Sequence, residues 1–209
     1  MGIFQKLFTR TPEPSEPFPI IIVSGLPRSG TSMMMKILEA GGLAIVSDGL
    51  READEDNPKG YYELEDVKAL ANGLEPAWLA DAEGKVVKVI TFLLQYLPVT
   101  HRYKVIFMRR EINEILASQA KMLERRHETS ADSDEKVRDA YLEHLKRVKV
   151  WLSNQSNMDV LSIEYRALLE KPQEVIPSLI EFLGAPFTPE QISAMQLVPD
   201  KTLYRNRSA

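Results

Sequence analysis

The stretch IIIVSGLPRSGTSM, residues 20–33, decides what kind of fold this 209-residue chain forms. Its apolar beginning, Ile20 to Val23, predicts a buried strand, and two glycines and a proline then form a tight loop before a helix that begins at Thr31. The first N–H groups of a helix lack partners within it and carry the positive end of its dipole, so they bind anions. Arg28 adds a cation, and hydroxyls suited to phosphate or sulfate oxygens come from Ser29, Thr31 and Ser32. The stretch therefore predicts an anion site.

The loop has nearly the spacing of the nucleotide triphosphatase motif GxxxxGK[ST], but Thr31 stands where that motif has lysine. An Asp at the end of an apolar strand, which would hold magnesium, is also missing, because the apolar run 105–108 continues into Arg109 and Arg110. These features argue against an ATPase. A nucleotide kinase or other phosphoryl transferase with a degenerate loop stays open as an alternative.

The strand, the residues PRSGT at 27–31 and the following helix resemble the 5′-phosphosulfate loop of the sulfotransferase family. In that family a later strand ends in an arginine that grips the 3′-phosphate of the nucleotide together with a serine eight residues on. Here Arg110 follows the run 105–108, and Ser118 lies eight residues further along, although Glu111 and Ile112 replace the Asn-Pro that family members often have. The resemblance implies nucleotide binding by Pro27, Arg28, Ser29, Gly30, Thr31, Ser32, Arg110 and Ser118.

The run KVVKVI, residues 85–90, resembles the family's middle strand, whose terminal lysine works at the transferred sulfuryl group and corresponds to Lys88. Many cytosolic members place a histidine base just after this lysine, but here the residue two positions on is Ile90. Other branches use a glutamate on a segment after the first helix. The resemblance therefore implies Glu63 as the base, with Glu52 and Glu55 as alternatives.

Residues 160–172 resemble the family's strand and "Tyr-Glu-Asp-Leu" turn, and the helix that follows ends in Phe-Leu-Gly at 182–184. The resemblance implies that Tyr165 helps to hold the nucleotide, with Arg205 and Arg207 as further candidates. The matched pieces occur in the family's order and cover most of residues 20 to 190.

The resemblance implies a function, which is transfer of a sulfuryl group from 3′-phosphoadenosine 5′-phosphosulfate (PAPS) to a hydroxyl or amine. Arg28, Lys88 and the loop N–H groups would stabilise the charge that develops on the bridging oxygen, and Glu63 would take the acceptor proton. The expected partners are the nucleotide donor and a small-molecule, glycan or lipid acceptor. A sulfotransferase-like domain that binds a nucleotide without turnover is a second alternative.

The composition limits the other possibilities. Lys and Arg number 26 against 30 Asp and Glu, a formal net charge of −4, which argues against general nucleic-acid binding. The chain has no cysteine, and the spacing of His101, His127 and His144 is not typical of metal ligands, so we expect no metal. With no apolar run long enough to span a bilayer and no secretory signal, we expect a cytoplasmic protein.

The chain reads as a flexible tail, residues 1–19, followed by a single domain, residues 20–209. Continuous apolar runs alternate with helical stretches, which predicts a three-layer α/β fold with helices on both faces of a parallel sheet. The expected strands are 20–23, 43–46, 86–90, 105–108 and 160–163. The expected helices are 31–40, 64–72, 112–126, 134–154, 173–183 and 189–195.

Overall fold

The computed structural model describes residues 18–50, 60–73, 76–128 and 132–201. Their strands form a five-stranded sheet of order β2-β3-β1-β4-β5, in which every neighbouring pair is parallel. The strands are β1 Ile20–Gly25, β2 Ile45–Val46, β3 Val86–Lys88, β4 Tyr103–Arg109 and β5 Met158–Glu164. The predicted parallel sheet is therefore confirmed, with the fully buried β1 at its centre.

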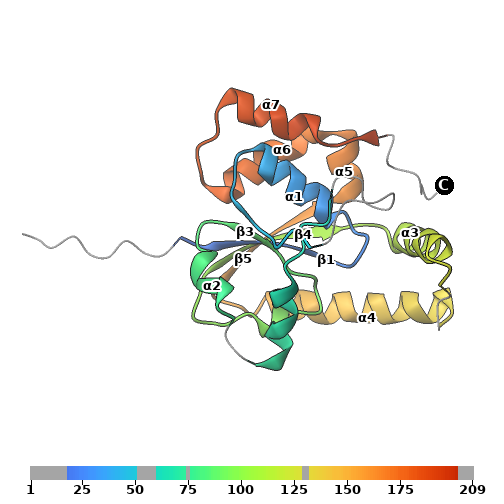
Figure 1. Cartoon of the computed structure of the whole chain (residues 1–209). Coiled ribbons are helices and arrows are strands. Elements are labelled where there is room, and N and C mark those ends of the chain that lie inside the picture. Colours follow the sequence, from blue (N-terminus) through green and yellow to red (C-terminus); the bar gives the residue numbers. More distant parts are fainter. Residues whose placement is uncertain (1–17, 51–59, 74–75, 129–131, 202–209) are drawn as a thin grey trace, which may run out of the picture.

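Helices cover both faces of the sheet, which confirms the predicted three layers (Figure 1). One face carries α1, α5, α6 and α7, whereas α2 and α4 lie on the other and α3 stands beyond one end of the sheet. The helices are α1 Thr31–Ala40, α2 Trp78–Asp81, α3 Ile112–Arg125, α4 Asp134–Leu152, α5 Tyr165–Glu170, α6 Pro172–Leu183 and α7 Pro189–Leu197. Two 3₁₀ helices, η1 Glu65–Asn72 and η2 Leu94–Tyr96, complete these elements. In the part of the chain that the structure describes, no helix combines the length and apolar character needed to cross a membrane.

Several local predictions were wrong in detail. The stretch 64–72 is a 3₁₀ helix, and its buried residues Val67 and Leu70 are three positions apart, which is the repeat that puts side chains on one face of a 3₁₀ helix. The turn expected after the last strand is a short helix, α5. The predicted tail lies almost wholly outside the described residues, as do Glu52, Glu55, Arg205 and Arg207.

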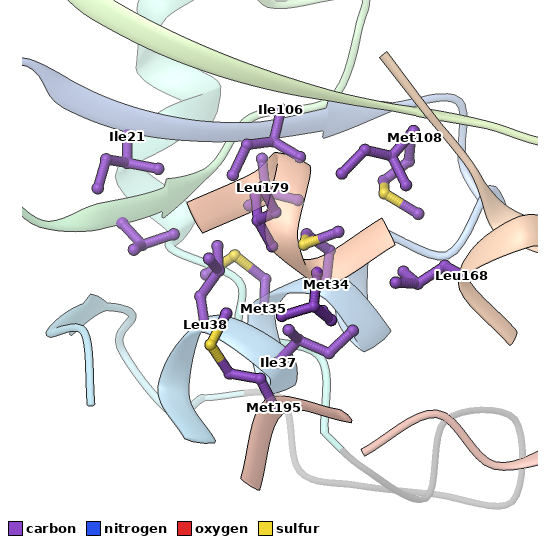
Figure 2. Close-up of a cluster of buried hydrophobic side chains, with 14 of the residues drawn as sticks. Ile21, Met34, Met35, Ile37, Leu38, Ile106, Met108, Leu168, Leu179 and Met195 are labelled. Carbon is purple, nitrogen blue, oxygen red and sulfur yellow. The ribbon is translucent and has the colours of Figure 1, made fainter. Parts of the chain in front are cut away.

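Helix α1 is packed against the sheet on one side and against helices α6 and α7 elsewhere (Figure 2). Met34, Met35 and Ile37 are fully buried, and they belong to one cluster with Ile106 of β4 and Leu179 of α6. The three consecutive methionines at 33–35 are thus largely core residues rather than a binding surface. Since packing fixes α1 on several sides, it also fixes the loop that leads into the helix.

The carboxyl ends of the strands meet at one edge of the sheet. Gly25, the last residue of β1, lies opposite Met108 near the end of β4. A Cβ on Gly25 would come within 2.3 Å of the Ser29 hydroxyl and 2.9 Å of the Met108 carbonyl oxygen, so the loop and β4 leave room only for glycine at this position. This edge is where open α/β sheets bind ligands.

Candidate active site

The loop between β1 and α1 makes a tight turn closed by a hydrogen bond from the Ser29 N–H to the Leu26 carbonyl, 3.1 Å. Arg28 and Gly30 have left-handed backbones, with φ of 68° and 100°. A Cβ on Gly30 would lie 2.4 Å from the ring of Tyr165, the first residue of α5. The loop is therefore wedged against Tyr165, and its shape depends on Gly30.

The predicted Ser29 hydroxyl lies inside this loop. It is buried and has no hydrogen-bond partner in the structure, as is also true of the Ser24 hydroxyl at the end of β1. Buried polar atoms are usually paired, and unpaired ones often mark binding sites. Of the other candidate residues of the loop, Thr31 is buried, while Pro27 and Ser32 are half-buried.

Arg110 lies where β4 passes into α3, and three neighbours hold its side chain. Its Nη1 donates to the Arg28 carbonyl at 3.0 Å, its Nε donates to the Glu114 carboxylate at 3.1 Å, and its guanidinium lies 4.3 Å from the centre of the Tyr165 ring. Glu114 is almost fully buried. Sequence reasoning did not identify Glu114, although its position four residues after Arg110, at the start of a helix, is the spacing of a helical ion pair.

Arg28 reaches the same place from the loop. Its Nε donates to the Ser118 hydroxyl of α3 at 3.0 Å. The two predicted anion-binding elements, the loop and the start of α3, are therefore joined to each other by Arg28 and Arg110. Burial raises the pKa of Tyr165, which keeps its hydroxyl protonated as a donor beside them.

A large open cavity adjoins this cluster. Its volume is about 1320 Å³, and Ser29, Arg110 and Glu114 form part of its wall, with Lys146 and Lys149 of α4 further along. This space exceeds that of most small-molecule pockets, so it has room for a nucleotide beside the cluster.

Lys88 ends β3, and its side chain is largely buried. The ammonium donates to the Tyr61 carbonyl at 2.8 Å and to the Ser32 hydroxyl, in the first turn of α1, at 3.4 Å. The Glu63 carboxylate lies 3.6 Å away. The structure thus brings together the lysine and glutamate that the resemblance singled out, beside the start of α1.

A third group of side chains lies near the loop, on the face of the sheet opposite to α1 (Figure 1). Thr91 donates its backbone N–H to the Gly25 carbonyl at 3.2 Å, and its hydroxyl lies 2.9 Å from Nε2 of His144 on α4. The imidazole stacks on Phe92, with ring centres 4.0 Å apart. Burial, and to a smaller extent the charge of Arg147, lowers the pKa of His144. No sequence motif pointed to this contact between α4 and the segment after β3.

Comparison with known proteins shows the family to which the chain belongs. A family model described as "Sulfotransferase domain" matches residues 19–197. The chain belongs to the sulfotransferase family. The comparison with curated proteins found no match.

Solved sulfotransferases share the fold at low sequence identity. Sulfotransferase STF1 from Mycobacterium tuberculosis is 17% identical, with a TM-score of 0.59 over 86% of this chain and 71% of that one. Mouse sulfotransferase SULT7A1, solved in complex with PAP, is 15% identical, with a TM-score of 0.52 over 92% of this chain and 67% of that one. Sulfotransferase STF9 from Mycobacterium avium is 11% identical, with a TM-score of 0.55 over 86% of this chain and 67% of that one. These likenesses support the same three-layer fold.

Proposed function

We propose that this sulfotransferase moves a sulfuryl group from PAPS to a hydroxyl or amine of a small-molecule, glycan or lipid acceptor. The observation that carries the proposal is the joining of two cationic elements at one edge of the sheet, with Arg28 bound to Ser118 and Arg110 bound to the Arg28 carbonyl. PAPS carries an anionic group at each end of its ribose, so a donor site needs two anion-binding elements held at a fixed separation.

The loop would take the 5′-phosphosulfate. The N–H groups at the start of α1 and the hydroxyls of Ser29, Thr31 and Ser32 would donate hydrogen bonds to it. Arg110 and Ser118 would take the 3′-phosphate, with Tyr165 packed against the guanidinium of Arg110. Pro27 and Gly30 contribute the shape of the loop rather than polar contacts. Ser118 accepts a hydrogen bond from Arg28 and Arg110 pairs with Glu114, so nucleotide binding would exchange these two internal hydrogen bonds for bonds to phosphate.

In the transfer step, the bond between sulfur and the oxygen that bridges to the 5′-phosphate breaks, and a bond from sulfur to the acceptor oxygen or nitrogen forms. Negative charge grows on the bridging oxygen, which leaves with 3′-phosphoadenosine 5′-phosphate (PAP). Lys88 and Arg28 are cations held at this edge beside the start of α1, and they would stabilise that charge. Glu63 would accept the acceptor's proton, since its carboxylate lies beside Lys88.

The donor is tested by calorimetric titration with PAP, with ADP and magnesium-ATP in parallel, on the natural chain and on Arg110→Ala. We expect binding that needs the 3′-phosphate and falls by roughly 100-fold in the variant, because a charge-assisted pair to phosphate is lost. Arg125→Ala is the control, since this arginine is exposed at the end of α3 and does not line the cavity. A preference for magnesium-ATP would overturn the proposal in favour of phosphoryl transfer.

The base is tested by Glu63→Gln. We expect turnover to fall by roughly 100-fold while PAP binding is retained, because general-base catalysis typically contributes a factor of this size. Glu65→Gln is the control, since this exposed carboxylate lies two positions away and pairs with Lys68. Unchanged turnover in Glu63→Gln would remove Glu63 from the mechanism. PAP binding without transfer to any acceptor would instead favour a binding domain without catalysis.

A further inference from the structure

Glu63 belongs to a segment, residues 60–63, that is neither helix nor strand. The backbone N–H of Asp48 donates to the Glu63 carbonyl at 3.2 Å, which ties the segment to the chain that follows β2. A base has to stay within a fraction of an ångström of its working position. The side chains of the segment must therefore supply much of the restraint that regular structure supplies elsewhere in the site.

Tyr62 gives the segment its shape. Its backbone is left-handed, with φ of 53°, a conformation that residues with a Cβ adopt rarely. On either side of it, the Tyr61 carbonyl and the Glu63 carboxylate both face Lys88, at 2.8 and 3.6 Å from its ammonium. The Tyr62 side chain lies instead against α1. An unfavourable backbone at such a place persists only where surrounding contacts hold it.

Those contacts come from α1. The Tyr62 hydroxyl donates to the Glu39 carboxylate at 2.8 Å, and the Lys36 ammonium donates to the same carboxylate at 2.7 Å. The Tyr62 ring packs against the buried cluster that includes Met34 and Met35. The first residue of α1 follows the anion loop, and its last turn holds Tyr62. Helix α1 therefore fixes the position of Tyr62 relative to the loop.

We propose that Tyr62 is a positioning residue, whose hydroxyl bond to Glu39 of α1 sets the Glu63 carboxylate against Lys88. The catalytic consequence rests on the proposed sulfuryl transfer with Glu63 as base. The ionisation states suit the contact at neutral pH. Burial raises the pKa of Tyr62, which keeps it a donor, and the hydrogen bond from Lys36 lowers the pKa of Glu39, which keeps it a charged acceptor.

The experiment is a double-mutant cycle on turnover. Tyr62→Phe keeps the ring and removes the hydroxyl, and we expect kcat to fall roughly tenfold with no change in the KM for PAPS, because the donor site is untouched. Glu39→Ala should give the same loss, and the double variant should lose no more than either single one. Glu39→Gln keeps an oxygen acceptor for the hydroxyl and should restore most of kcat. Tyr96→Phe, at an exposed tyrosine, is the control and should leave kcat unchanged.

Two results of the turnover measurements would overturn the proposal: an unchanged kcat in Tyr62→Phe, or losses that multiply in the double variant. Hydrogen exchange of the Asp48 amide gives a readout independent of turnover. Its bond to the Glu63 carbonyl should open more often in Tyr62→Phe, and the amide should exchange several-fold faster. If the natural chain transfers no sulfuryl group, the proposed function fails, while faster exchange would still support the positioning contact. Unchanged exchange would overturn that contact.

Discussion

The two halves of the candidate site are built differently. The donor half consists of two connections from a strand to a helix, and the ends of β1 and β4 place Arg28 and Arg110 directly against each other. In the acceptor half only Lys88 lies on a strand, and Glu63 reaches it from an irregular segment held by side chains. Damage to the donor half should therefore abolish nucleotide binding, whereas damage to the acceptor half should leave binding intact and slow the transfer.

The largest effect is expected at Gly30, in the donor half. Gly30→Ala adds a Cβ 2.4 Å from the Tyr165 ring and strains a backbone with φ of 100°, so the ring and the Arg110 stacked on it must move. We expect PAP affinity to fall by at least roughly 100-fold, or about 2.7 kcal/mol, measured by calorimetry. Gly73→Ala is a matched control, because Gly73 also has a left-handed backbone, with φ of 73°, but among the described residues nothing other than its chain neighbours lies within 4 Å of the added Cβ. Equal effects at Gly30 and Gly73 would show that backbone strain, and not the contact with Tyr165, is responsible.

The next test concerns Lys88, in the acceptor half. Lys88→Met keeps much of the side-chain volume and removes the charge, and we expect kcat to fall roughly 100-fold with nearly unchanged PAP affinity. Lys85→Met, at the residue before β3, controls for loss of a lysine near the same strand. Steady-state kinetics and calorimetry on both variants separate the two parameters. If Lys88→Met lost PAP binding instead, Lys88 would belong to the donor half and the comparison would fail.

A smaller effect is expected at Glu114, whose carboxylate pairs with the guanidinium of Arg110. Both side chains are largely buried, with 3% of Glu114 and 8% of Arg110 exposed, so Glu114→Gln leaves a buried cation without its counter-charge. We expect the free protein to lose about 2 kcal/mol of stability in urea unfolding. PAP should stabilise the variant more than the natural chain, since its 3′-phosphate would supply the missing charge. Glu124→Gln, an exposed carboxylate on the same helix, should change neither quantity. Equal stabilisation of both proteins by PAP would show that Arg110 does not bind the 3′-phosphate.

The backbone of the proposed donor half could be predicted from the sequence, because its residues stand in short local patterns. The run from Ile20 to Thr31 specifies strand, loop and helix in order, and the packed methionines of α1 follow it directly. The strands at 43–46 and 86–90 were predicted too long, since β2 and β3 cover only Ile45–Val46 and Val86–Lys88. β4 and β5 were predicted too short, because they extend through polar residues, such as Lys104 and Asp159, that pair along the sheet. Their backbones are fixed by neighbouring strands rather than by their own side chains.

For the proposed acceptor half, the sequence indicated only candidate residues and not their contacts. The position after β2 placed Glu63 at the correct edge of the sheet, but the contact of Tyr62 with Glu39 joins residues 23 positions apart, and that of His144 with Thr91 joins residues 53 apart. No periodicity in a sequence encodes such pairs, because they depend on how helices dock on the sheet. The left-handed backbone of Tyr62 was equally hidden, since glycine or asparagine is the usual signal for it.

The smallest expected effect tests the third group of side chains, beside the donor half, where His144 binds Thr91 and Thr91 binds the Gly25 carbonyl. Burial lowers the pKa of His144 below the ordinary value of 6.5, so below pH 6.5 the unfolded chain binds more protons at this residue than the folded one. Stability from this residue is therefore complete above pH 6.5 and declines as the pH falls toward the lowered pKa. His144→Phe keeps a ring on Phe92 and should unfold more easily at every pH. Its stability in urea titrations should depend less on pH between about 7.5 and 5.5, roughly one unit either side of an ordinary histidine pKa. If the two proteins lost stability in parallel over this window, His144 would not be the titrating group, and α4 would contact the loop without making it sensitive to pH.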